Sequence, residues 1–198
     1  MEFDVTVQIA GEDVLAGRLY QNVRHGDETT TFSYDPSYLS DPRSFSLAPD
    51  MSLGAGSFHS SGLRQLRAFE DCMPDRWGRN LMLRAERSRA RDEQRAPRTL
   101  FEADMLAGVN DEARQGALRI WSDTGEVLSP VSDGVPRETS IPALLDAADR
   151  ASRDMNADIR DLLAAGSSLG GARPKASIRD EQGCLCIAKF PKADEGAL

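Results

Sequence analysis

The stretch with the clearest chemical potential is a run of small residues that ends in a lysine. Residues 166–175 read Gly-Ser-Ser-Leu-Gly-Gly-Ala-Arg-Pro-Lys. Because Gly and Ala carry little side-chain bulk, the backbone N–H groups of Gly170, Gly171 and Ala172 could approach an anion closely. The segment departs from the Walker pattern, which has lysine where Ala172 stands, and it contains no G-x-G-x-x-G. Any grip on a phosphate would therefore come from loop amides and from lysine.

Lysine usage draws attention to the same region. The chain uses arginine 21 times and lysine three times, and all three lysines fall in the last 24 residues. A lysine ammonium acts as a compact point charge, which suits a nucleotide phosphate. Lys175 ends the small-residue loop, and Lys189 lies beyond a predicted turn at 180–183. Both lysines are therefore candidate phosphate ligands.

The strand that carries Lys189 would place this lysine beside apolar side chains. At a period of two residues, Leu185, Ile187 and Lys189 share one face of the strand. An apolar wall with a single cation is typical of a site that holds adenine and phosphate. A second interpretation remains open, in which a Gly/Ser linker precedes an edge hairpin and the lysine extends from the surface into water.

The N-terminal elements that would support this region predict a small antiparallel sheet. Residues 3–9 alternate apolar and polar side chains, which is typical of a strand with one buried face. Two further strands are predicted at 14–20 and 29–34. Residues 35–62 are crowded with Pro, Ser, Gly and Asp, which favours an ordered connection without helices or strands.

Helices are predicted to dominate the middle of the chain. A firm helix starts at Asp75, with Trp77 and Leu81 on one face, and we expect the tryptophan to fill the core. The remaining predicted elements are a helix over 100–109, a short strand over 117–121, helices from about 141 and 154, of which the second ends at Gly166, and a final hairpin.

Arginines are concentrated in and after the helix that starts at Asp75. Residues 76–98 contain eight arginines and three acidic residues, so this stretch carries a charge of +5 while the rest of the chain carries −13. If the helix persists that far, one face holds five arginines at steps of three and four residues: Arg84, Arg87, Arg91, Arg95 and Arg98. Two interpretations are open, a solvated helix face and a docking stripe for an acidic partner.

Composition limits the remaining function classes. The chain has 198 residues and a net charge of −8, which disfavours direct nucleic-acid binding through the overall field. It contains no apolar run of the roughly 18 residues that a membrane span needs, and it begins without a signal-peptide pattern. The expected location is therefore the cytoplasm, without a membrane partner. The three cysteines are too few for a disulfide framework, and we expect free thiols rather than metal ligands.

Taken together, these stretches resemble the HipA-like serine/threonine kinase toxins of bacterial type II toxin–antitoxin systems. Residues 168–176, followed by a hairpin and Ala-Lys-Phe-Pro at 188–191, are similar to the glycine-rich loop and nucleotide-binding lysine of that family. Three further stretches resemble its N-terminal part: Phe32–Tyr34 with Tyr38 and Leu39, Met73–Arg79, and Gly108–Arg119.

The resemblance implies roles for individual residues. Lys189 would contact ATP phosphates, and the loop amides would lie over them. Ser168, or the adjacent Ser167, would match a regulatory serine that the family autophosphorylates to switch itself off. A phosphoserine would add about two negative charges to a loop built to hold phosphate. The implied ATP-binding set comprises Ser168, Gly170, Gly171, Ala172, Lys175, Ile187 and Lys189.

The sequence departs from the family in its catalytic residues. Phosphoryl transfer also requires a catalytic-loop Asp, together with an Asn and an Asp that bind magnesium. No such motifs are recognisable here, and the chain stops nine residues past Lys189. We therefore expect no catalytic or metal-binding residue in this chain and no kinase activity from it alone. It looks like the N-terminal portion of a kinase that would use ATP and magnesium to phosphorylate a serine of a protein substrate.

The expected fold class is α+β, with a small N-terminal antiparallel sheet and packed helices, followed by the start of a kinase-like N-lobe with a glycine-rich loop and a β-hairpin. The predicted domains are a HipA-like N-terminal subdomain over 1–122, a linker over 123–140 and the beginning of a HipA-like kinase core over 141–198. The alternative is a non-catalytic interaction module or split subunit, which would bind a helix-turn-helix antitoxin or a separate kinase lobe.

Overall fold

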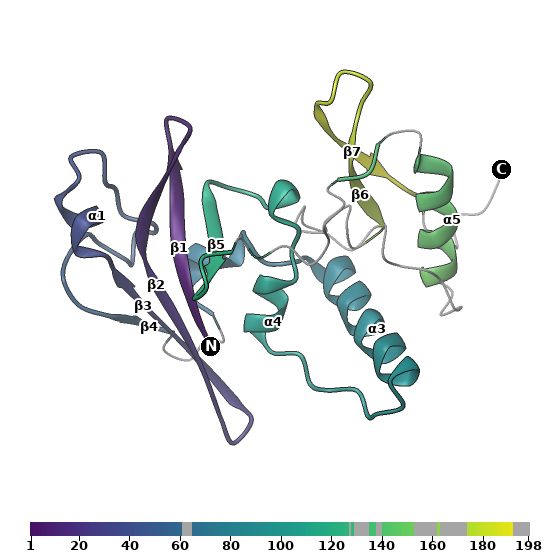
Figure 1. The fold of residues 1–198 in the computed structure, drawn as a ribbon, viewed down its shortest axis with the longest axis horizontal. Helices are drawn as coiled ribbons and strands as arrows, with labels where there is room; N and C mark the ends of the chain where they lie inside the picture. Colours follow the sequence, from purple (N-terminus) through teal and green to yellow (C-terminus); the bar gives the residue numbers. More distant parts are fainter. Residues whose placement is uncertain are drawn as a thin grey trace. The chain divides into compact units, whose positions relative to one another are not determined.

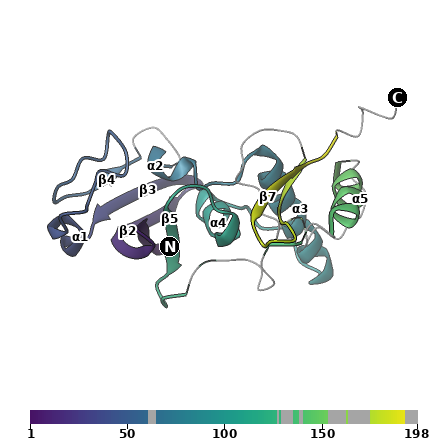
Figure 2. The ribbon, with the colours of Figure 1, turned by 90° about the horizontal axis from the view of Figure 1, so that it is seen from above.

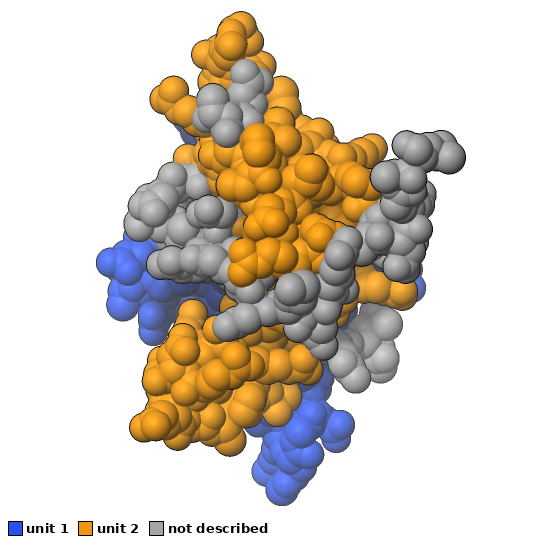
Figure 3. Space-filling model, turned by 90° about the vertical axis from the view of Figure 1, so that its right-hand side faces the viewer, with its two compact units in different colours: residues 1–73, 101–107, 115–128 blue, residues 74–100, 108–114, 129–198 orange. Residues whose placement is uncertain are grey.

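The computed structural model describes residues 1–60, 65–126, 128, 135–137, 140–152, 162 and 174–191. The chain divides into two compact units whose segments alternate along the sequence (Figure 3). The first unit comprises residues 1–73, 101–107 and 115–128, and the second comprises 74–100, 108–114 and 129–198. The domain boundaries proposed from the sequence stay a prediction, because the units group elements that pack together rather than consecutive stretches of chain.

The first unit is built on a five-stranded antiparallel sheet in the order β4-β3-β2-β1-β5 (Figure 1). Its strands are β1 (Glu2–Ile9), β2 (Glu12–Arg24), β3 (Asp27–Tyr34), β4 (Phe58–His59) and β5 (Leu118–Ser122). Along β1 the side chains of Phe3, Val5 and Val7 are buried and their neighbours are partly or fully exposed. The predicted alternation therefore forms one core face, and the three N-terminal strands and the later short strand are confirmed.

The connection over 35–62 is more structured than its composition indicates. It contains helix α1 (Pro36–Ser40) and strand β4, so the expectation of no helix or strand there is wrong. Asp35 begins α1, because its Oδ1 accepts the Ser37 backbone N–H at 2.8 Å. Elements of five and two residues are too short to leave a periodic signal in the sequence.

Two short helices complete the first unit, α2 (Arg67–Glu70) and α4 (Glu102–Ala107). The helix predicted over 100–109 is confirmed as α4. Its N-terminus is capped from the sheet, where the Glu28 carboxylate on β3 accepts the backbone N–H groups of Glu102 at 2.9 Å and Ala103 at 3.2 Å. A glutamate on a strand therefore anchors α4 to the sheet.

The second unit packs two helices and a β-hairpin around one core (Figure 2). Its elements within the described residues are α3 (Arg76–Asp92), the 3₁₀ helix η1 (Asp111–Ala113), α5 (Ile141–Ser152), β6 (Lys175–Arg179) and β7 (Leu185–Lys189). Trp77 and Leu81 of α3 share this core with Leu144 of α5 and Ile178 of β6. The predicted apolar face of α3, the helix from 141 and the final hairpin are confirmed. The helix predicted from 154 lies outside the described residues.

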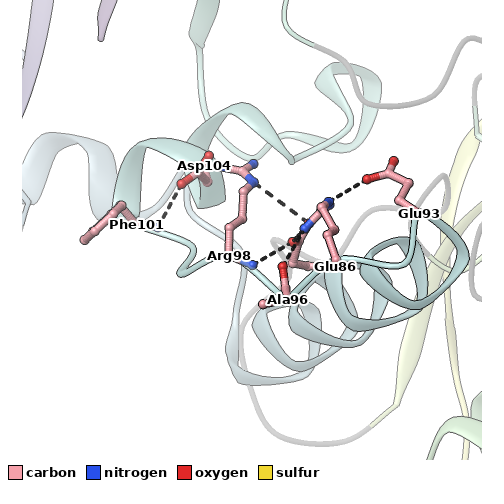
Figure 4. Close-up of polar contacts among 7 residues, drawn as sticks. Glu86, Glu93, Ala96, Arg98, Phe101 and Asp104 are labelled. Carbon is pink, nitrogen blue, oxygen red and sulfur yellow. Dashed lines mark hydrogen bonds and ion pairs between the residues drawn. The ribbon is translucent and has the colours of Figure 1, made fainter.

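Helix α3 ends earlier than a five-arginine face requires. Gln94 adopts a left-handed backbone conformation with φ of 52°, and the Arg95 backbone N–H bonds to the Ala90 carbonyl at 2.8 Å, which is a Schellman-type end. Arg95 and Arg98 therefore lie beyond the helix. Arg95 donates to the Glu86 carboxylate through its guanidinium, and Arg98 donates to it through its backbone N–H (Figure 4). The condition that the helix persists through Arg98 is not met, so the five-arginine face is wrong.

The fold class is α+β, with an antiparallel sheet at the N-terminus and packed helices, as predicted. None of the helices in the described part of the chain has both the length and the apolar character that crossing a bilayer demands.

Candidate functional site

Lys175, which ends the predicted phosphate loop, is the first residue of β6 and is buried. Its side chain is 6% exposed, and its ammonium forms an ion pair with Oδ2 of Asp75, whose side chain is 4% exposed. A buried charge needs a partner of opposite sign, because its removal from water is otherwise very costly. The two side chains therefore depend on each other.

The other carboxylate oxygen of Asp75 caps the N-terminus of α3. Asp75 is the N-cap of α3, and its Oδ1 accepts the Gly78 backbone N–H at 2.8 Å. Aspartate suits this position because its short side chain reaches the free N–H groups of the first helical turn. One carboxylate therefore both begins α3 and neutralises Lys175, and it joins the Met73–Arg79 stretch to the hairpin.

The other end of β6 is held in a similar way. Arg179, the last residue of β6, donates through Nη2 to the Glu112 carboxylate at 3.0 Å, and the Val135 backbone N–H reaches the same oxygen at 3.2 Å. These bonds, of which that from Arg179 has the largest effect, hold the pKa of Glu112 below its ordinary value. Glu112 lies in η1, within the Gly108–Arg119 stretch. Two segments singled out in the sequence therefore hold the two ends of one strand.

The inner face of the hairpin packs onto the helices. Ala176 and Ile178 of β6 lie in the same buried core as Trp77 and Leu81 of α3. Trp77 is 7% exposed, and its indole N–H has no hydrogen-bond partner among the residues that the structure describes. It acts as apolar filling at the start of a helix, as predicted. The hairpin is thus fixed by packing on one face and by ion pairs at both ends of β6.

The outer face of β7 carries the predicted nucleotide lysine. Leu185 is 49% exposed and Ile187 is 51% exposed, and Lys189 is exposed on the same face. Lys189 lies opposite Lys175 in the β6–β7 ladder, and no ion pair engages its ammonium within the described ranges. The predicted sharing of one strand face is confirmed. Of the two opposed lysines, Lys189 is the one that solvent reaches.

The predicted site residues divide into two groups. The structure places three of them on one hairpin: Lys175, Ile187 and Lys189. The loop residues lie outside the described residues, so their roles stay predictions: Ser167, Ser168, Gly170, Gly171 and Ala172. Among the residues that are described, no group of three or more His, Cys, Asp or Glu side chains gathers to hold a metal ion.

Sequence reasoning missed the two carboxylates that hold β6. Asp75 is recognisable as the start of a helix, and the sequence carries no sign that its second oxygen meets a lysine far along the chain. Glu112 lies within a stretch that was singled out, without a role of its own. The one available signal was charge, because a rare lysine that becomes buried requires a carboxylate near it.

The family model described as HipA N-terminal domain matches residues 7–98. The matched range contains β2, β3, β4 and all of α3, together with the Asp75 cap that precedes α3. No curated protein matches the chain.

Proposed function

We propose that this chain, whose residues 7–98 are a HipA-like N-terminal portion, supplies the ATP-phosphate side of a HipA-like serine/threonine kinase toxin. The observation that carries the proposal is the β6–β7 hairpin, on which an exposed lysine and two exposed aliphatic side chains share one face. A cation beside an apolar wall fits a nucleotide, because phosphate needs the charge and adenine needs the apolar surface.

In this proposal Lys189 contacts the phosphates of ATP. Lys189 is exposed, whereas the ammonium of Lys175 is already paired with Asp75. Lys175 would have to exchange that carboxylate for a phosphate in order to bind ATP, so its main task is to hold the start of β6. The amides of residues 170–172 would lie over the phosphates, because small residues let backbone N–H groups approach an anion.

Regulation would act on the same loop. Ser168, or the adjacent Ser167, would be the phosphorylated residue. A phosphoserine carries about two negative charges, which would compete with ATP for the amides and the lysine. Modification of this serine would therefore switch the kinase off.

The complete kinase would transfer the γ-phosphate of ATP to a serine of a protein substrate. The catalytic Asp and the residues that bind magnesium are not recognisable in these 198 residues, and the described ranges contain no metal-binding cluster. The residues present do not fit magnesium by themselves, so its ligands would belong to another part of the complete kinase. We expect the chain alone to bind ATP weakly at most and to transfer no phosphate.

Titration with a fluorescent ATP analogue tests the proposal. Lys189→Ala should abolish nucleotide binding and leave the free energy of unfolding almost unchanged, because the side chain is exposed. Arg89→Ala removes another exposed cation of the same unit and should leave binding unchanged. Measurable binding that is equally strong in the wild type and in Lys189→Ala would contradict the proposal. Phosphate transfer by this chain alone would contradict the expectation that its catalytic residues lie elsewhere.

A second candidate function is a non-catalytic interaction module or split subunit. It is favoured by three exposed arginines of α3, Arg76, Arg87 and Arg91, which form no ion pair within the described ranges. The partner would be an antitoxin of the helix-turn-helix type or a separately encoded kinase lobe. Co-expression with the products of neighbouring reading frames tests this candidate, because a stable complex would co-purify with the chain.

A further inference from the structure

One face of α3 is exposed along the whole helix, and we call it the arginine face. Its members recur every three or four residues, which places them in one row on the helix. At a rise of about 1.5 Å per residue, the row is about 22 Å long from its first arginine to its last. The arginine face consists of Arg76, Asn80, Leu83, Arg87 and Arg91.

The carboxylates of α3 do not neutralise this face. The helix contains two acidic residues, Glu86 and Asp92, and neither lies in the row. Glu86 accepts Nη1 of Arg95 at 2.5 Å and the backbone N–H of Arg98 at 2.9 Å. These bonds, of which that from Arg95 has the largest effect, lower the pKa of Glu86 to about 2. Glu86 therefore pairs with the segment that follows α3 and not with the arginine face.

Within the described residues, the arginines of the row have no counter-charge. Arg76, Arg87 and Arg91 form no hydrogen bond or ion pair through their side chains within the part of the chain that is described. Arg87 and Arg91 are four residues apart, and like charges at this spacing repel each other. An anionic partner laid along the row would relieve that repulsion. The charge of the arginine face therefore suits the binding of an anionic partner.

We propose that the arginine face of α3 docks an acidic helical segment of a partner protein. The row has the width of one helix, and its two arginines four residues apart, Arg87 and Arg91, match carboxylates at the same spacing on a second helix. Guanidinium groups bind carboxylates through two parallel hydrogen bonds, which suits arginine better than lysine. The observations behind this proposal do not include the nucleotide site proposed on the β6–β7 hairpin.

A nucleic-acid duplex fits this surface less well. A duplex carries a dense negative charge over its whole length and would also approach the rest of the protein. Outside residues 76–98 the chain carries a charge of −13, which repels such a polyanion. A short acidic helix meets the arginine row without covering the acidic remainder.

Fluorescence anisotropy with the full chain tests the docking proposal. The first probe is a labelled helical peptide of about 18 residues, long enough to cover the row, with glutamates every three or four residues on one face. A second peptide has the same composition with the glutamates spread around the helix, and a DNA duplex is the third probe. At about 0.05 M salt we expect binding of the first peptide, which weakens as salt is added because the charges become screened.

Two charge reversals on α3 provide the matched variants. Arg87→Glu should weaken binding of the first peptide about tenfold, because a carboxylate in the row repels the glutamates of the probe. Arg89→Glu makes the same charge change at an exposed position outside the row and should alter Kd by less than about twofold. Both side chains are exposed, so both variants should keep the helix content that circular dichroism measures.

Any of the following four outcomes would overturn the docking proposal. Equal losses for the two variants would show a diffuse charge effect, and equal binding of the two peptides would show that spacing is irrelevant. Failure to bind the first peptide would show that the row is a solvated face. Tighter binding of the duplex that depends on Arg87 would show that the partner is a nucleic acid.

Discussion

The two ends of β6 use the same chemistry in different surroundings. At its first residue, Lys175 and Asp75 pair with side chains that are 6% and 4% exposed, and at its last, Arg179 and Glu112 pair with side chains that are 35% and 47% exposed. Water and salt screen the second pair far more than the first. Removal of one partner should therefore lower the free energy of unfolding much more at the Lys175 end of β6 than at the Arg179 end. The same type of contact can be essential at one end of a strand and dispensable at the other.

The largest effect is expected from breaking the buried pair. Lys175→Met should lower the free energy of unfolding by about 3–5 kcal/mol, because the Asp75 carboxylate stays buried without a counter-charge. Urea unfolding measures the loss. Fluorescence of Trp77, recorded with Trp121 replaced by Phe, reports on the unit that contains the pair.

A double variant controls this experiment. Asp75→Asn keeps an oxygen for the N-cap of α3 and removes the charge, so Lys175→Met combined with Asp75→Asn should recover part of the lost stability. Strict additivity of the two single losses would refute a coupled pair. A loss below about 1 kcal/mol for Lys175→Met would place the buried pair in the same class as an exposed one.

The ion pairs of Glu86 are intermediate in burial between the two pairs at the ends of β6. The Glu86 side chain is 4% exposed, whereas its partners Arg95 and Arg98 are 35% and 52% exposed. Glu86→Gln should lower the urea midpoint by less than Lys175→Met does and by more than a change at Arg179 does. The three midpoints, measured in the same buffer, test this order, and a reversed order would break the relation between burial and cost.

The pH dependence of unfolding tests whether the charge of Glu86 causes the loss of stability in Glu86→Gln. The pKa of Glu86 is about 2 in the folded protein, against an ordinary value of 4.5. Because the folded pKa is the lower one, the stabilisation is complete above about pH 4.5 and is lost as the pH falls toward 2. The difference in midpoint between wild type and Glu86→Gln should shrink over that range. A difference that stays constant down to pH of about 2.5 would mean that the carboxylate charge is not responsible.

Breaking the exposed pair should have a small effect. Arg179→Met should lower the free energy of unfolding by about 0.2–1 kcal/mol, because water replaces the lost partner of Glu112. The pKa of Glu112 is lowered in the folded protein, so this contribution is present above the ordinary glutamate range and is lost as the pH falls through the lowered value. Urea unfolding at neutral and acidic pH measures both. A loss above about 2 kcal/mol would contradict the contrast between the ends of β6.

The smallest change in stability is expected when the salt concentration is raised. Raising sodium chloride from about 0.05 M to about 0.5 M should reduce the effect of Arg179→Met toward zero and leave the effect of Lys175→Met nearly unchanged. Urea midpoints of both variants at the two salt concentrations measure this. Equal salt sensitivity would indicate that solvent ions reach the Lys175–Asp75 pair.

The sequence predicts the fold well where burial imposes a regular period. The alternation over 3–9, the apolar face of α3 and the final hairpin are all confirmed, because each buried face repeats every two residues or every three to four. The region 35–62 escaped prediction because its elements are too short to show a period. The end of α3 escaped because Gln94 takes a left-handed conformation that sequence statistics assign mainly to glycine.

The candidate site was only partly predictable. The face shared by Leu185, Ile187 and Lys189 follows from strand geometry alone. The burial of Lys175 does not, because it depends on a helix start that tertiary packing brings to β6. Which charges meet is decided by the folded core, and no local pattern reports it.

Asp75 gives the two proposed binding surfaces a common origin. Its carboxylate begins the helix that bears the arginine face and anchors β6, the strand that follows the proposed phosphate loop. A nucleotide that drew Lys175 away from Asp75 would change the charge at the first turn of α3. Nucleotide binding and partner docking would then be thermodynamically linked, and each ligand would alter the affinity for the other by the same factor.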